Sequence, residues 1–330
     1  DDDQAWFGTH YVGDATGRLN SMGWVGAAPG VEPQNVYVWG ACNASVCWWS
    51  QAAAALDAAR FAYVRVAVID FWGTQYNLGL ANAVAAAWNY DSAGTAVGMT
   101  LLAPAGWYRP NSQQPPGPVY PALYDHVLGV SGIKPDSSFA HSSICLGGDF
   151  ASNYGSHVDL AGGFWGWNAW GNNGFTQVCG STVGASYVAG VAALVRARNP
   201  SRNTVWVADA LTKTAHDLGT AGWDDHFGNG LVDAPAAMSY VSVLNVSIDG
   251  PDEVRPNVDC SWYADVSGGS PPYTYQWYQN WMGAGTDPWV DLYTGYTGFV
   301  IRLYAWGADG SQGYGQLFVT NTSSAPICIY

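Results

Sequence analysis

The sequence predicts an α/β domain with a parallel sheet, followed by a small all-β domain. Apolar, β-branched segments such as residues 64–69 alternate with segments of helical periodicity such as residues 48–60. This strand–helix–strand order is typical of a parallel sheet that carries helices on its faces. From Val246 onward the helical patterns stop, and short alternating segments rich in Gly, Pro, Tyr and Trp follow. We therefore expect two domains, at residues 1–244 and 245–330.

Composition excludes some partners. The 330 residues include 25 acidic and 11 basic side chains, for a net charge of −14, which argues against nucleic acid or an anionic membrane as a partner. Only 11% of the residues are charged while 15% are aromatic, so we expect some aromatic surface to face a partner. No apolar run reaches the about 18 residues of a membrane span, and no signal peptide is visible. The initial DDDQ is typical of a processed end.

The six cysteines predict an oxidising compartment. They show no CxxC metal-binding spacing, so three disulfides and a secreted or extracellular protein are the expectation. Proximity in the sequence and domain membership suggest the pairs Cys42–Cys47, Cys145–Cys179 and Cys260–Cys328.

Residues 180–195, GSTVGASYVAGVAALV, predict a long apolar helix. Ser181 or Thr182 would cap its first turn through the side chain, a structural role that implies no catalytic activity. Gly184 and Gly190 would let another backbone approach the helix closely.

The same stretch resembles the signature of the subtilisin-like serine peptidases, GTSMAxPHVAG, and the register puts Thr182 at the nucleophilic serine. Residues 7–31 resemble the family's segment around the catalytic histidine, HGTHVAG to GVAPGA. Phe7 occupies the position of the catalytic histidine. His10 corresponds to the second histidine of that motif, which is a packing residue in the family. Residues 98–107 resemble the segment that ends in the oxyanion-binding asparagine.

Trp107 stands at that asparagine position. Further matches extend the resemblance over about residues 7–240, which implies a three-layer parallel sheet of subtilisin type with its N-terminal strands missing. The family's catalytic aspartate would precede the present chain. We expect residues 36–39 to pair directly with residues 64–69 across the gap, and we interpret Asp70 as a polar residue at a strand end.

Acyl transfer by this family needs a nucleophile, a general base, an acid that orients the base, and oxyanion donors. The resemblance places Thr182, Phe7 and Trp107 at three of these positions and supplies no residue at the fourth. Phenylalanine accepts no proton, and indole differs from a carboxamide in both size and donor position. The expectation is a subtilisin-like fold without peptidase activity, and hence no catalytic residues.

Three functions remain open for such a fold. The first is a structural, self-associating extracellular component, and the second is a carbohydrate-binding module. Trp165, Trp167 and Trp170 in the segment GGFWGWNAWGNNG would form the interface or the sugar platform, unless they are buried against the second domain. The third is an active serine endopeptidase with displaced catalytic residues. The partners that we expect are further copies of the chain or a polysaccharide.

Residues 245–330 resemble the immunoglobulin-like or PKD-like β-sandwiches that accompany many secreted bacterial enzymes. SGGSPPYTYQW, at residues 267–277, is the most specific part, because Gly and Pro set a turn before alternating aromatic residues.

Two minor patterns complete the prediction. Asn43, Asn245 and Asn321 each begin a short glycosylation sequon. Calcium is common in the family, but only Asp224 and Asp225 offer adjacent acidic ligands, and they are equally typical of a solvated turn. We therefore predict no metal site and no cofactor, with calcium as the exception to test.

Overall fold

The computed structural model describes residues 15–16, 26–30, 49–89, 97–110, 116–145, 148–170, 174–240, 244–269, 271–308, 311–325 and 328. Side chains of residues 143–145, 168–170 and 174–175 are not described. The chain divides into two compact units, Asp1–Tyr240 and Val241–Tyr330, which we call the first and second unit.

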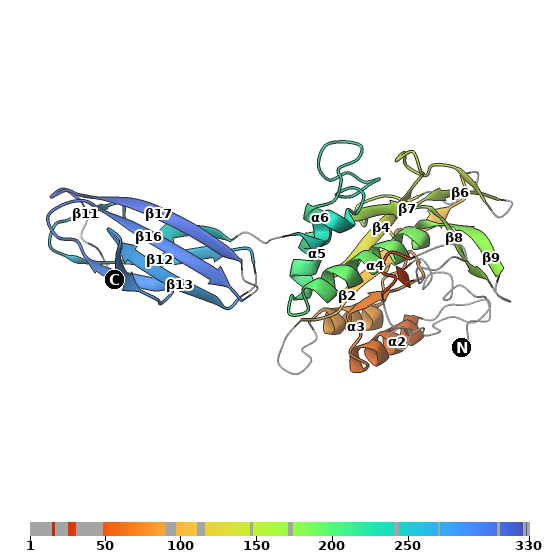
Figure 1. The fold of residues 1–330 in the computed structure, drawn as a ribbon, viewed down its shortest axis with the longest axis horizontal. Helices are drawn as coiled ribbons and strands as arrows, with labels where there is room; N and C mark the ends of the chain where they lie inside the picture. The colour runs from red at the N-terminus through yellow and green to blue at the C-terminus, as the bar shows by residue number, and fades with distance from the viewer. Residues whose placement is uncertain are drawn as a thin grey trace. The chain divides into compact units, whose positions relative to one another are not determined.

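The first unit mixes parallel strands with helices (Figure 1). Its helices are α2 (Trp49–Phe61), α3 (Leu78–Trp88), α4 (Ser181–Arg198), α5 (Thr204–Lys213) and α6 (Ala234–Met238). Its strands are β1 (Val66–Val68), β2 (Thr100–Pro104), β3 (Trp107–Tyr108), β4 (Val127–Ile133), β5 (Ser143–Cys145), β6 (Gly148–Ser152), β7 (Leu160–Gly163), β8 (Trp165–Trp170) and β9 (Gly174–Cys179).

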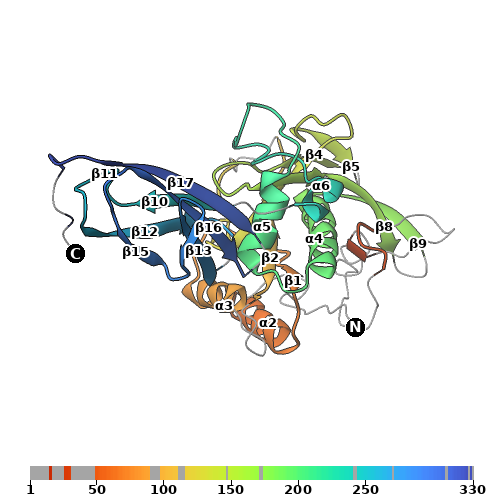
Figure 2. The ribbon, with the colours of Figure 1, turned by 60° about the vertical axis from the view of Figure 1, so that its left-hand side comes forward.

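The central sheet has the order β1-β2-β4-β7, and every described pair in it is parallel. Helices α2 and α3 cover one face, where they pack on Leu101 and Ala103 of β2. Helices α4, α5 and α6 cover the other face, where Leu102 points. Figures 1 and 2 show these layers, and the predicted α/β class with a parallel sheet is confirmed. Residues 36–39 lie outside the described chain, so their pairing with β1 stays a prediction.

Helix α4 is the buried helix of the first unit. A Cβ added to Gly162 of β7 would lie 2.7 Å from Cα of Gly184, so helix and strand backbones touch at this point. A Cβ on Gly190 would lie 2.6 Å from the carbonyl oxygen of Ala15. Both predicted glycine contacts are therefore confirmed, and any larger residue here would push the helix off its neighbours.

The predicted cap of this helix is wrong. The N-cap is Gly180, at φ 145°, and it makes no side-chain capping bond. Ser181 and Thr182 already lie within the first helical turn, and their hydroxyl groups bond elsewhere. Only glycine adopts this backbone angle without strain, which explains why the cap is not a serine or threonine.

The second unit consists of strands only, within its described residues. Three strands form one sheet in the order β10-β12-β15, and five form another in the order β11-β17-β16-β13-β14. The strands are β10 (Asn245–Asp249), β11 (Glu253–Val254), β12 (Asp259–Ser267), β13 (Tyr273–Gln279), β14 (Met282–Gly285), β15 (Trp289–Tyr293), β16 (Phe299–Gly307) and β17 (Gln312–Asn321). Trp262 of β12 and Trp277 of β13 are fully buried in the core that the two sheets share.

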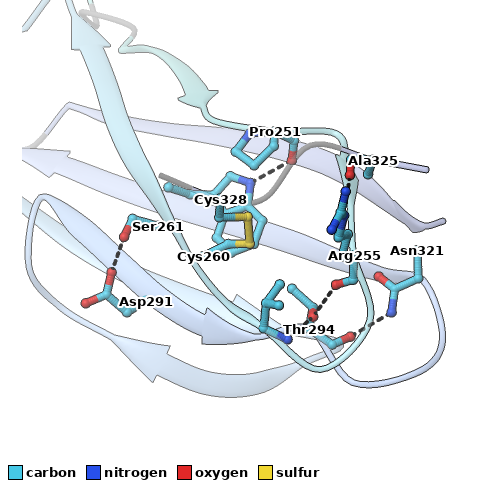
Figure 3. The surroundings of a disulfide bond; sticks show 11 residues. Pro251, Arg255, Cys260, Ser261, Asp291, Thr294, Asn321, Ala325 and Cys328 are labelled. Carbon is cyan, nitrogen blue, oxygen red and sulfur yellow. Dashed lines mark hydrogen bonds between the residues drawn. A yellow bond between two sulfur atoms is a disulfide. The ribbon is translucent and has the colours of Figure 1, made fainter. Parts of the chain in front are cut away.

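A disulfide between Cys260 and Cys328 confirms one predicted bridge. Figure 3 shows it beside hydrogen bonds that fasten the same end of the unit. Arg255 Nε donates to the carbonyl oxygen of Ala325 over 2.7 Å, and the Thr294 hydroxyl donates to the carbonyl oxygen of Arg255 over 2.7 Å. The C-terminal segment is thus held by covalent and polar contacts together.

Among the described helices, none combines the length and apolar character needed to cross a bilayer.

Candidate functional site

The first turn of α4 gathers the residues that the sequence singled out. Trp107, on β3, lies beside Gly180, because a Cβ added to that glycine would be 3.6 Å from the indole Cδ1. The Trp107 ring also meets Trp72 edge-on, with 6.1 Å between ring centroids, and Phe150 with 5.1 Å. We call Trp72, Trp107 and Phe150 the aromatic cluster. It fixes the indole against the N-terminus of the helix.

Ser181 anchors the helix start to the segment before Trp107. It is fully buried, and its hydroxyl donates to the carbonyl oxygen of Gly106 over 2.9 Å. The proton is therefore used in a backbone contact, and this serine has a structural role.

Thr182 has a different partner. Its buried hydroxyl donates a hydrogen bond to the carboxylate of Asp70, which directly follows Ile69 at the carboxyl end of the β1 segment. Asp70 is exposed to solvent as a residue. The protein atoms crowded around its carboxyl nevertheless desolvate that group and raise its pKa to about 7, against the lowering effect of the Thr182 bond. A carboxyl with this pKa exchanges its proton near neutrality.

Asp70 is a functional candidate for which the sequence offered a catalytic role only as the less favoured alternative. We interpreted it as a polar residue at a strand end, and the position is right, but its contact with Thr182 was missed. One signal was available. The carboxyl ends of parallel strands gather at one edge of the sheet, where sites of α/β proteins form.

His157 is the buried imidazole near this region. Its Nε2 lies 2.9 Å from the carbonyl oxygen of Ala105, two residues before Trp107, so Nε2 carries the proton. Burial lowers the pKa of His157, and the Ala105 bond opposes that shift. A neutral histidine that donates to a backbone carbonyl stabilises the segment and leaves catalysis to other groups.

A cavity of about 450 Å³ opens beside Trp107. Its lining residues are Trp72, Thr74, Trp107, Tyr108, Arg109, Pro116, Gly117, Pro118, Val119 and Asn153. Asn153 fixes one wall, since its side chain accepts from the N–H of Gly117 over 2.8 Å and donates to the carbonyl of the same residue over 2.7 Å. The cavity could accept an apolar side chain at the edge of the site.

Asp224, Asp225 and His226 form a cluster whose ligand atoms lie within 4.8 Å of one another. One oxygen of Asp224 accepts from the N–H groups of His226 and Phe227, and the other accepts from the N–H of Thr220. These three bonds stabilise a turn, and calcium binding by the cluster stays a prediction.

The three tryptophans proposed as an interface lie on β8, which pairs with β9 as a two-stranded ribbon. Trp167 is 62% exposed, whereas Trp165 is half-buried and its indole N–H has no acceptor among the described residues. The Trp170 side chain lies outside the described atoms. The structure thus gives one free tryptophan for contact with a partner.

Of the predicted disulfide and glycosylation residues, the structure describes some and leaves others undescribed. Cys179 is disulfide-bonded, but the Cys145 side chain is not described, so their pairing stays a prediction, as does the Cys42–Cys47 bridge. Asn245 is exposed, while the Asn321 Nδ2 donates to the carbonyl groups of Thr294 and Gly295. The nitrogen that would carry a glycan on Asn321 is therefore occupied in the folded protein.

Phe7, His10 and Asn43 lie outside the described residues. The structure brings Trp107 and Thr182 together around Gly180 and adds Asp70 to them.

The central parallel sheet between two layers of helices defines a three-layer α/β protein, and comparison with known families identifies which one. The model of the subtilase family, peptidase S8, matches residues 1–230. The chain belongs to the subtilase family.

Individual relatives are distant. The chain is 29% identical to M-protease of Shouchella clausii (strain KSM-K16) over 231 residues, and 30% identical to alkaline elastase YaB of Bacillus sp. (strain YaB) over 232 residues. Each match covers 70% of this chain and 54% of the relative, so the chain spans about half the length of these curated relatives. Subtilisin Savinase of Lederbergia lenta is 29% identical, with 70% and 76% covered.

Among solved structures, MycP1 with its N-terminal propeptide removed superposes with a TM-score of 0.56 at 23% identity. The match covers 70% of this chain and 78% of that one. At this identity the similarity establishes the fold alone.

Proposed function

We propose that this subtilase homologue is a secreted protein without peptidase turnover, which serves as a structural, self-associating component outside the cell. The absence of peptidase turnover is supported by the position of Trp107 against Gly180. An indole carries its single donor N–H in a different place from a carboxamide, and loss of one oxyanion donor typically costs about a hundredfold or more in rate.

The Thr182 contact supports the same conclusion. In the family mechanism the nucleophile gives its proton to an imidazole, whereas here the hydroxyl bonds to the carboxylate of Asp70. Below pH about 7 that carboxyl is largely protonated and cannot accept a second proton.

Self-association is supported by the β8–β9 ribbon. No other described strand pairs with this ribbon, so its two edges offer backbone groups to a further strand. Trp167 stands on it, largely exposed, and tryptophan is among the residues that contribute most to protein interfaces.

Two experiments test the proposal. Purified chain is incubated with casein and with chromogenic peptides, and we expect no turnover; hydrolysis that Thr182→Ala abolishes would refute the first half. Activity that survives Thr182→Ala but not Ser181→Ala would instead show that the nucleophile is Ser181.

Self-association is tested by light scattering, which measures the molar mass of the protein across a dilution series. We expect polymers that Trp167→Ser dissociates and that Trp289→Ser, a control at a 48% exposed residue of the second unit, leaves intact. A monomer at every concentration would refute self-association.

One observation favours a second candidate, a hydrolase with displaced catalytic residues. A hydroxyl that donates to a carboxylate of pKa about 7 has the geometry of a nucleophile beside a general base. Thr182 would attack and Asp70 would take its proton. Turnover should then rise as the pH passes 7, because only the ionised carboxylate accepts a proton, and Asp70→Asn should remove it. A flat rate of zero between pH 5 and 9 would exclude this candidate.

A further inference from the structure

The five-stranded sheet of the second unit carries aromatic side chains on the surface that faces away from the core. Alternate residues of β16 point inward, where Ile301 and Leu303 are fully buried. The intervening residues point outward, and they include Tyr304 and Trp306. We call the outward side chains of β13, β16 and β17 the aromatic face. They are Thr274, Gln276, Tyr278, Val300, Arg302, Tyr304, Trp306, Gln312, Tyr314, Gln316 and Phe318.

The rings of this face form one connected group. Tyr304 and Tyr314 stand opposite each other on adjacent strands, with 4.9 Å between ring centroids. Tyr304 and Trp306 follow along β16 with planes only 20° apart and centroids at 6.3 Å. Tyr278 meets Tyr304 edge-on at 5.8 Å. The contacts hold the rings in place before any ligand arrives, so binding costs little side-chain entropy.

These rings remain accessible. Trp306 is 39% exposed, Tyr314 46% and Phe318 66%. At one end, Arg302 lies with its guanidinium 3.8 Å from the ring centroid of Trp281, which extends the platform by a further exposed indole.

The polar groups between the rings are mostly uncharged amides and phenols, with Arg302 as the charged side chain among the outward positions named above. Gln276 is opposite Tyr304, and Gln316 is opposite Arg302 on the neighbouring strand. Amide side chains and phenols both donate and accept hydrogen bonds. None of the outward side chains of these three strands is a carboxylate, although the whole chain carries a net charge of −14.

The outer surface of the three-stranded sheet is different. It also exposes aromatic residues, Tyr263 at 52% and Trp289 at 48%. Asp265 and Asp291 stand among them and bond to serines on the neighbouring strands. The three-stranded sheet therefore carries acidic groups among its outward aromatic residues, whereas the five-stranded sheet carries Glu253 on its edge strand β11, next to β17.

We propose that the aromatic face binds a neutral polysaccharide, whose sugar rings stack on Trp306, Tyr304 and Tyr314 while hydroxyl groups bond to the neighbouring glutamines. A pyranose ring presents C–H groups on its flat faces and hydroxyls around its edge, which fits aromatic rings interleaved with amides. This surface is separate from Trp165 and Trp167, and the inference does not depend on the loss of peptidase activity.

The experiment uses the full chain and three polymers: microcrystalline cellulose, chitin particles and soluble hydroxyethylcellulose. Binding is measured by co-sedimentation with the particles and by retardation in a gel that contains the soluble polymer. We expect retention on at least one polymer. Trp306→Ala and Tyr314→Ala should each weaken binding about tenfold or more, since every variant loses a stacking surface.

Trp289→Ala is the matched control, because it removes an equally exposed indole from the acidic face, and it should bind as the parent does. Trp167→Ala should also leave binding unchanged. Retention on none of the three polymers would overturn the proposal, as would binding that Trp306→Ala leaves intact. If Trp306→Ala instead dissociates oligomers in the absence of polymer, the face is a protein interface and the proposal is wrong.

Discussion

Tryptophan has opposite roles at the start of α4 and on the aromatic face of the second unit. Trp107 is 36% exposed and Trp306 is 39% exposed, so solvent reaches both to the same extent. Trp107, however, is fixed between Trp72, Phe150 and the backbone of Gly180, whereas Trp306 lies on a sheet among tyrosines. The comparison shows that the exposed fraction alone does not separate an aromatic residue that fills a site from one that offers a surface.

The largest loss of stability should come from removing the disulfide within the second unit. Replacing Cys260 and Cys328 by alanine opens a loop with a sequence separation of 68 residues, which should lower the free energy of unfolding by about 4 kcal/mol. Calorimetry should show that the transition of the second unit moves while that of the first does not. If both transitions move together, the units do not unfold independently and the comparison between them needs revision.

A valine at Gly184 should destabilise the first unit by about 3 kcal/mol or more, because its side chain has no room against Gly162. The measurement is chemical denaturation followed by the fluorescence of the full chain. Gly117→Ala is the control, since nothing lies within 4 Å of its added Cβ, and it should change stability by less than about 0.5 kcal/mol. An unchanged denaturation midpoint for Gly184→Val would contradict the packing of α4.

Substitutions of Trp107 and Trp306 should lower the free energy of unfolding by different amounts. Trp107→Ala removes ring contacts to Trp72 and Phe150 and should cost about 2 kcal/mol, a partly buried share of the usual value for tryptophan. Trp306→Ala should cost less than about 1 kcal/mol, because the aromatic contact of its ring among the described residues is with Tyr304. Equal losses from the two variants would remove the distinction between a filled site and an open surface.

The smallest effect should be that of pH, because Asp70 is exposed and solvent screens its carboxyl. The folded state raises the pKa of Asp70 to about 7 and that of Asp159 to about 6, both by desolvation, from 3.8. A folded state that holds these protons more tightly loses stability as the pH rises from about 4 to 7. Asp70→Asn should therefore flatten this decline and unfold at a higher temperature than the parent at pH 8. If the stability of the variant fell more steeply with pH than that of the parent, the predicted direction of the Asp70 pKa shift would be wrong.

Much of the first unit could be predicted from the sequence. The GSTVGASYVAG segment fixes the register of α4, and Gly184 predicted a close backbone approach, which the structure shows to be that of Gly162. The cap was assigned wrongly because Ser181 and Thr182 are the common capping types, whereas here the backbone requires the φ of Gly180.

Contacts between distant segments were harder to foresee. Nothing local to Asp70 indicates that its carboxylate meets Thr182, since the two residues come together only when β1 and α4 pack in the three-layer fold. The same holds for the second unit. Alternation in its strands is visible in the sequence, but the pattern does not tell which of the two sets, Ile301 with Leu303 or Tyr304 with Trp306, faces the core.

The central claim is that the start of α4 no longer hydrolyses peptide bonds, and reaction with a fluorophosphonate probe tests it most directly. The probe forms a covalent bond to an activated hydroxyl without needing a matching peptide substrate, so poor substrate choice cannot hide activity. We predict that the intact mass of the protein stays unchanged after incubation at pH 6, 7 and 8. A mass increase that peptide mapping places on Thr182, and that both Thr182→Ala and Asp70→Asn abolish, would contradict the account.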